Sequence, residues 1–101
     1  MECFLTLKGH TDGVRDIINL PNGMIMSGSY DKTIKIWNTT PNLIKAAEST
    51  VNSPINSNIS SIQYLAKTLK SHLCGVICLL YLTGQYAASG SADYTVKIWD
   101  L

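Results

Sequence analysis

The feature that most constrains the fold of this 101-residue chain is an internal repeat. A shift of 62 positions aligns 15 identical residues, without a gap, among the 33 positions from Thr6 to Asn38. The alignment opens with Thr6-Leu7-Lys8 against Thr68-Leu69-Lys70. Repeat proteins are built from supersecondary units that cannot bury their apolar faces alone and therefore stack on one another. We infer that the chain consists of two copies of one unit.

Each copy is predicted to form short β-strands rather than helices. Apolar or β-branched runs are separated by turn signals such as Pro21-Asn22-Gly23 and by tight turns at Asp31-Lys32 and Asp93-Tyr94. Strands that are apolar on both faces are typical of sheets covered on both sides. The pattern predicts an all-β fold of stacked four-stranded sheets. The expected strands lie at 3–7, 14–20, 24–29 and 33–37, and again near 62–69 and at 76–82, 86–91 and 95–99.

The charge balance excludes two classes of partner. Eight Lys and Arg residues against seven Asp and Glu give a net charge of +1, whereas nucleic acids and anionic membranes are bound by clustered basic side chains. No apolar run reaches the roughly 18 residues that span a bilayer, and the N-terminus lacks the pattern of a signal peptide. We therefore expect an intracellular protein, cytoplasmic or nuclear, that binds neither nucleic acid nor membrane.

The cysteines favour the same compartment. Cys3, Cys74 and Cys78 form an odd set without a CxxC pair. Free buried thiols in a reducing environment are expected, rather than a disulfide framework or a zinc site.

The motifs of both copies resemble the WD40 repeat family. Gly9-His10 is followed by the segment 27–38, SGSYDKTIKIWN, and His72 is followed by 89–100, SGSADYTVKIWD. The resemblance implies four-stranded antiparallel blades of a β-propeller, in which each sequence repeat starts with the outer strand of the preceding blade. Residues 1–8 are then the outer-type strand of a neighbouring blade, 9–70 the first repeat, and 71–101 a truncated second repeat without its own outer strand.

The resemblance also implies a buried hydrogen-bond network in each blade. A buried imidazole needs a partner on each nitrogen, and carboxylate, hydroxyl and indole N–H groups can supply such a chain. Duplication of the set, and the absence of a GxSxG turn, argue against a catalytic Ser-His-Asp arrangement. Ser29 and Ser91 are alternatives for the serine position. The expected members are His10, Ser27, Asp31 and Trp37, and then His72, Ser89, Asp93 and Trp99.

Two departures from the family pattern stand out. The period of 62 exceeds the roughly 40–45 residues of such repeats, so we expect an insertion at about 39–60. It is rich in Asn, Ser and Thr, which favours a loop over a short helix carrying Leu43, Ile44, Ala47 and Val51.

The second departure is the number of units, because propellers typically have four to eight blades. The fold is therefore expected to be a partial or oligomer-completed propeller. Three explanations remain open: a fragment of a longer propeller, self-assembly into six blades from three copies or eight from four, and an open form completed by a partner. In the second, the N-terminal strand of one copy supplies the missing outer strand of another.

The function implied by the resemblance is a non-catalytic scaffold or adaptor for protein or peptide partners. No metal spacing, phosphate loop or carboxylate pair supports an enzyme, a metal site or a cofactor. A non-functional partial gene product is an alternative. For Arg15 and Tyr30 there is also a simpler interpretation, in which Arg15 forms a weak surface ion pair with Asp12 or Asp16 and Tyr30 only covers a turn. The family's contact positions correspond to Gly13, Arg15, Tyr30, Gly75, Ile77 and Ala92.

Overall fold

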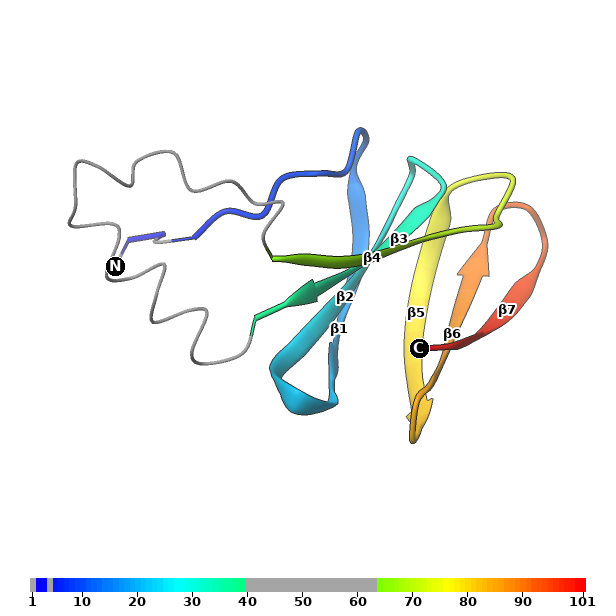
Figure 1. The fold of residues 1–101 in the computed structure, drawn as a ribbon. Helices are drawn as coiled ribbons and strands as arrows, with labels where there is room; N and C mark the ends of the chain where they lie inside the picture. Colours follow the sequence, from blue (N-terminus) through cyan, green and yellow to red (C-terminus); the bar gives the residue numbers. More distant parts are fainter. Residues whose placement is uncertain (1, 4, 40–63) are drawn as a thin grey trace.

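The computed structural model describes residues 2–3, 5–39 and 64–101, and this part of the chain is all-β. It folds into two antiparallel sheets that pack against each other (Figure 1). Sheet A has four strands in the order β1-β2-β3-β4, and sheet B has three in the order β5-β6-β7. The predicted all-β class and the missing outer strand of the second unit are confirmed. In the described ranges no helix is long and apolar enough to cross a membrane.

Each sheet is a simple meander that follows the repeat. Three strands of sheet A, β1 to β3, have their counterparts in β5 to β7, and β4 leads from one sheet to the next. A short 3-10 turn, Pro21–Gly23, joins β1 to β2. The strand bounds are β1 Val14–Leu20, β2 Met24–Ser29, β3 Thr33–Asn38, β4 Leu65–Lys70, β5 Val76–Thr83, β6 Tyr86–Ser91 and β7 Val96–Asp100.

The turns that precede β3 and β7 are held by aspartate side chains. Lys32 and Tyr94 have positive φ angles of 76° and 71°, a conformation that costs energy for residues other than Gly, Asn or Asp. Asp31 Oδ1 accepts the backbone N–H of Thr33 at 2.8 Å, and Asp93 Oδ1 accepts that of Thr95 at 2.9 Å. Such local side-chain hydrogen bonds fix the tight turn at the predicted place in both units.

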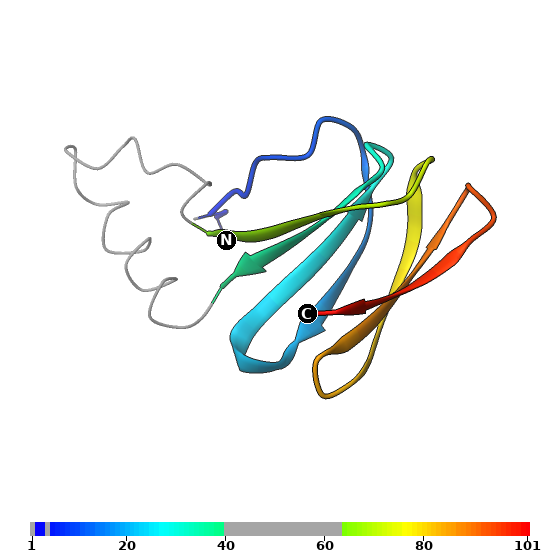
Figure 2. The same ribbon diagram turned by 45° about the vertical axis from the view of Figure 1, so that its right-hand side comes forward.

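An apolar core fills the space between the sheets. Sheet A contributes Met26, Ile34 and Ile36, and sheet B contributes Val76 and Leu79, together with Ala87. The two views of the fold show the sheets stacked face against face (Figures 1 and 2). The burial of these side chains is the main favourable term that holds one sheet on the other.

The sheets approach closely where β2 carries a glycine. A Cβ atom built on Gly28 would lie 2.7 Å from Cγ1 of Val76, well inside ordinary van der Waals contact. Gly28 therefore allows Val76 of sheet B to reach the backbone of sheet A. A second, smaller cluster forms on the opposite face of sheet A, where Leu7 packs with Trp37 and Tyr64.

Three sequence expectations differ from the structure. Residues 5–8 form no strand, because no strand in the described ranges pairs with them. The three cysteines are free but exposed, so the expected burial of the thiols is wrong; Cys78, for example, projects from sheet B on a face that the described residues leave open. In the described ranges each sheet is packed against the other on one face only, and the opposite face of sheet A is covered in part by the smaller cluster around Trp37. The insertion at 39–60 lies outside the described residues except for Thr39.

Replacement of Gly28 by Ala should separate the sheets and destabilise the fold by about 1–3 kcal/mol, as overpacking of a dense core does. Chemical unfolding followed by tryptophan fluorescence measures the change. Gly90→Ala is the matched control at the equivalent position of sheet B, where the added methyl group would meet only Sγ of Cys78, an exposed side chain that can rotate away. Equal losses for the two variants would contradict the assigned role of Gly28.

Candidate functional site

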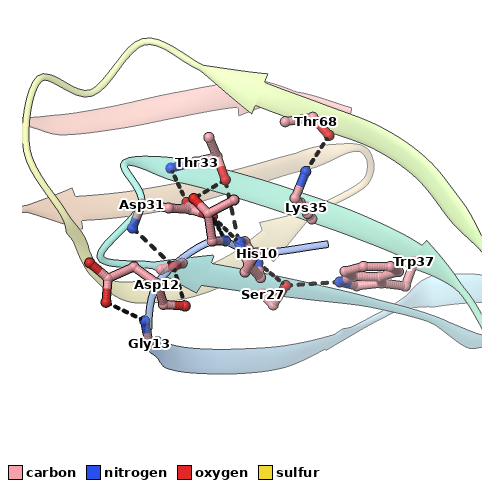
Figure 3. A network of polar contacts seen from close by, with 11 residues as sticks. His10, Asp12, Gly13, Ser27, Asp31, Thr33, Lys35, Trp37 and Thr68 are labelled. Atoms are coloured by element: carbon pink, nitrogen blue, oxygen red, sulfur yellow. Dashed lines mark hydrogen bonds and ion pairs between the residues drawn. The ribbon is translucent and has the colours of Figure 1, made fainter. Parts of the chain in front are cut away.

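The first repeat brings four polar side chains from separate segments into one chain of hydrogen bonds (Figure 3). His10, before β1, contacts Asp31 Oδ2 through Nδ1 at 2.8 Å and Ser27 Oγ through Nε2 at 2.7 Å. The indole N–H of Trp37 on β3 donates to the same hydroxyl oxygen at 2.8 Å. These hydrogen bonds link the tight turn at Asp31 to Trp37, which packs with Tyr64 in the smaller apolar cluster.

The second repeat contains the same arrangement. His72 lies 2.8 Å from Asp93 through Nδ1 and 2.6 Å from Ser89 Oγ through Nε2. Trp99 donates its indole N–H to Ser89 Oγ at 2.8 Å. The imidazole and indole rings also meet edge to face, with centroids 6.2 Å apart, so the two sheets carry superimposable networks.

Ser29 and Ser91, the alternatives for the serine position, form other hydrogen bonds. Ser29 Oγ donates to the carbonyl of Asp12 at 3.2 Å and accepts the backbone N–H of Asp31 at 3.0 Å. Ser91 Oγ likewise lies 3.2 Å from the carbonyl of Cys74, the repeat equivalent of Asp12, and accepts the backbone N–H of Asp93 at 3.1 Å; it also contacts the carbonyl of Gly75 at 2.9 Å. Ser29 and Ser91 therefore fix the turn, while the histidines use Ser27 and Ser89.

The network strongly favours the charged form of both aspartates. Burial by itself raises the pKa of Asp31, but hydrogen bonds from the hydroxyl of Thr33, from His10 and from the backbone N–H groups of Thr33 and Thr11 outweigh it and hold that pKa well below its usual range. The hydroxyl of Thr95 has the largest effect on Asp93, whose pKa is likewise depressed. Both carboxylates are thus held ionised as acceptors.

The connectivity of each network matches that of an acyl-transfer triad, since Asp contacts Nδ1 of His and Ser contacts Nε2. The surroundings do not match, because Ser27 and Ser89 are buried and each hydroxyl oxygen already accepts an indole N–H. A carbonyl substrate has no path to either oxygen. Among the described residues, no group of three or more His, Cys, Asp or Glu side chains is placed to hold a metal ion.

A second group of sequence-predicted residues meets at one end of the interface between sheets A and B, which we call the blade boundary. The ring of Tyr30 lies between two glycines, where Cβ atoms on Gly13 and Gly75 would approach it to 3.3 Å and 2.9 Å. The backbone N–H of Tyr30 donates to the carbonyl of Gly13 at 3.0 Å. Arg15 Cζ stands 5.5 Å from the centre of the same ring, within the range of a cation–π interaction.

The guanidinium of Arg15 has no carboxylate partner among the residues that the structure describes. Its two acidic neighbours in sequence are engaged elsewhere. Asp12 Oδ1 accepts the backbone N–H of Gly13 at 2.7 Å, and Asp16 Oδ2 accepts the backbone N–H of Leu79 in sheet B at 2.8 Å. In the described ranges, Arg15 therefore forms no ion pair with Asp12 or Asp16.

The equivalent positions of the second repeat lack this chemistry. Ile77 and Ala92 are exposed, and neither offers a charge or a hydrogen-bonding side chain. The register shifts between Val14 and Asp16 in β1, and between Val76 and Cys78 in β5. Arg15 and Ile77 are thus the extra residues of two β-bulges, a feature that redirects side chains at the ends of strands and that the sequence reasoning missed.

Comparison with known proteins gives the family. The WD domain, G-beta repeat family, WD40, matches residues 1–38 and 63–100. The chain belongs to the WD40 repeat family. Strands β1 to β3 fall within the first matched region and β4 to β7 within the second, and WD40 proteins are generally non-catalytic scaffolds that bind protein partners.

The relatives and similar structures agree with this assignment. The ribosome biogenesis protein WDR12 homolog of Drosophila mojavensis is 30% identical over 102 residues, covering 100% of this chain and 23% of that protein. The homolog of Trichoplax adhaerens is 29% identical and covers 96% of this chain and 29% of that protein. The chain thus spans less than a third of the length of these relatives. The crystal structure of the computationally designed Ika4 protein matches 95% of this chain and 46% of its own with a TM-score of 0.62 at 23% identity, a likeness of fold alone.

Loss of the shared serine hydroxyl should destabilise a blade. Ser27→Ala leaves the indole N–H of Trp37 and one nitrogen of His10 without their partner, at a cost of about 1–3 kcal/mol for each buried group left unpaired. Chemical unfolding of the variant measures the loss. Ser71→Ala, at an exposed serine just before His72, is the control and should change the unfolding free energy little. A Ser27→Ala variant as stable as the wild type would contradict a stabilising role for the network.

Acid should weaken the fold through the two aspartates. Because folding lowers their pKa from the ordinary value of 3.8, their contribution to stability is complete above that value and is lost as the pH falls towards the folded-state pKa. The free energy of unfolding should therefore decrease between about pH 5 and about pH 2. Asp31→Asn should lower stability at neutral pH and flatten this acid dependence, and an unchanged dependence in Asp31→Asn would contradict the assignment.

Proposed function

We propose that the chain is a non-catalytic WD40 scaffold that binds a protein or peptide partner at the Arg15–Tyr30 end of the blade boundary. The observation that carries the proposal is an exposed tyrosine ring, set between two glycines, with an arginine beside it that lacks an acidic partner in the described ranges. Tyrosine and arginine dominate the binding energy of many interfaces. The first repeat therefore carries the recognition, and Gly75 of the second contributes backbone next to the ring.

The chemistry of the two side chains indicates the kind of ligand. A guanidinium presents N–H donors in a fork that matches a carboxylate, and the exposed ring offers an apolar surface with a hydroxyl at its edge. The contact between Arg15 and Tyr30 holds the cation over the ring and lowers the entropy that binding would otherwise cost. We expect a peptide segment with an Asp or Glu beside an apolar or aromatic residue.

The cellular setting is inferred from the relatives. Proteins named as ribosome biogenesis factors match this chain over its whole length, which favours a role within a large complex and, of the two compartments expected from the sequence, the nucleus. Binding of an acidic protein segment fits such a role and needs no clustered basic surface, in keeping with a net charge of +1.

The test is selection of binding peptides on the immobilised chain, followed by measurement of their Kd by fluorescence anisotropy. Selected peptides should contain an acidic residue, and Arg15→Gln or Tyr30→Ala should weaken binding at least about tenfold, the loss expected of a hot-spot side chain. Lys67→Gln, at an exposed cation on β4, and Tyr94→Ala, at an exposed tyrosine in the turn before β7, are the controls and should bind as the wild type does. Peptides that ignore Arg15 and Tyr30 would contradict the proposal.

A further inference from the structure

Sheet B presents an apolar face to solvent. Its strands carry exposed large side chains on the side away from sheet A, among them Leu80 on β5 and Val96 and Ile98 on β7. Contiguous exposed apolar surface of this kind usually marks an interaction site. Tyr86 and Leu82 extend the same exposed apolar surface.

The repeat shows what covers such a face. Ile98 corresponds to Ile36 of sheet A and Val96 corresponds to Ile34. Ile36 is 3% exposed because sheet B packs on it, whereas Ile98 is 60% exposed. The open face of sheet B is thus the counterpart of the face that sheet A buries within the chain.

Sheet A carries the complementary open face. Val76 and Leu79 are the side chains by which sheet B packs on sheet A, and their repeat equivalents are Val14 and Ile17. Leu79 is 7% exposed, but Ile17 is 60% exposed on the far side of sheet A. The chain therefore presents, at its two ends, both halves of an interface that it already forms once internally.

We propose that a second copy of the chain docks head to tail, with its sheet A on the open face of sheet B. The contact would repeat the internal one, with Val14 and Ile17 of the second copy packed against Ile98 and Leu80 of the first. The two open faces lie at opposite ends of the molecule, so one chain cannot join its own. A heterologous contact of this kind closes into a ring when the rotation permits, and propellers of four to eight blades correspond to two to four copies.

The same symmetry supplies the outer strand that sheet B lacks. In sheet A, β4 pairs with β3 so that Leu69 lies opposite Ile34 and Lys70 opposite Thr33. Leu7 and Lys8 are the repeat equivalents of Leu69 and Lys70. In the proposed contact, residues 5–8 of the second copy therefore add to the free edge of β7, and Figure 1 shows that the N-terminal segment and β7 lie at opposite ends of one chain.

One position distinguishes the proposed contact from the internal one. Asp16 Oδ2 accepts the backbone N–H of Leu79 across the internal interface at 2.8 Å. The repeat equivalent of Asp16 is Cys78, which would face the backbone of Ile17 in the second copy. The contact between copies thus lacks the hydrogen bond to a carboxylate that the internal contact has, and Cys78→Asp should supply that hydrogen bond.

The experiment is sedimentation equilibrium of the full chain over a range of concentrations, with circular dichroism to verify the fold. The wild type should show a discrete mass of two, three or four times 11.1 kDa. Ile17→Glu and Ile98→Glu each place a charge on one open face and should give folded monomers, whereas Tyr94→Glu, at a fully exposed apolar residue outside both faces, should assemble as the wild type does. Cys78→Asp should lower the concentration needed for assembly.

A mixing experiment identifies the geometry. Ile17→Glu retains an intact sheet B face and Ile98→Glu an intact sheet A face, so an equimolar mixture should form a one-to-one dimer that neither variant forms alone. A wild type that stays folded and monomeric at every concentration would overturn the proposal and leave the open faces to blades of another chain. So would a mixture that does not associate, or an Ile17→Glu variant that still dimerises, because the latter would mean a symmetric contact between two sheet B faces. Peptide binding at Arg15 is measured separately and does not depend on these outcomes.

Discussion

The constraint on which the rest of this structure depends is that each sheet has two apolar faces, while two sheets can cover only one face of each. The internal interface shows how the covering works: Val76 reaches the backbone of sheet A at Gly28, and Ile34 and Ile36 pack beneath it. Apolar side chains that remain in water forgo the stabilisation that burial supplies. Each described sheet therefore keeps an apolar face open to solvent, and the proposed contact between copies rests on these two faces.

Within each sheet, a buried polar network accompanies the apolar packing. His10 and His72 contact equivalent aspartate and serine partners at nearly the same distances. Among the described residues, no buried side-chain nitrogen or oxygen lacks a hydrogen-bond partner, which is the condition under which a buried network stabilises rather than weakens a fold. The network ties the tight turn to the tryptophan of the third strand, so that local turn geometry and sheet packing are established together.

The two repeats differ at positions outside the hydrogen-bond networks, among them the two side chains to which we assign partner binding. Tyr30 and Arg15 of the first repeat correspond to Ala92 and Ile77 of the second, and Asp16 corresponds to Cys78. None of these positions belongs to the networks, so they are free to diverge without loss of the sheet. The divergence places an arginine and a tyrosine at this position of the first repeat and the apolar side chains of Ile77 and Ala92 at the equivalent position of the second.

The sequence by itself determined the repeat, the three strands that recur in each unit and the turns at Asp31 and Asp93, because these depend on local pattern and on spacing that recurs twice. The residues of the networks followed from the resemblance of these motifs to WD40 repeats. Only the tertiary structure decided which faces are covered. The exposure of Cys78, the bulge at Arg15, the reach of Asp16 across to Leu79 and the absence of a strand at residues 5–8 all follow from which sheets lie next to each other. A strand pattern specifies that two faces are apolar, but the number of neighbours present specifies which of them is buried.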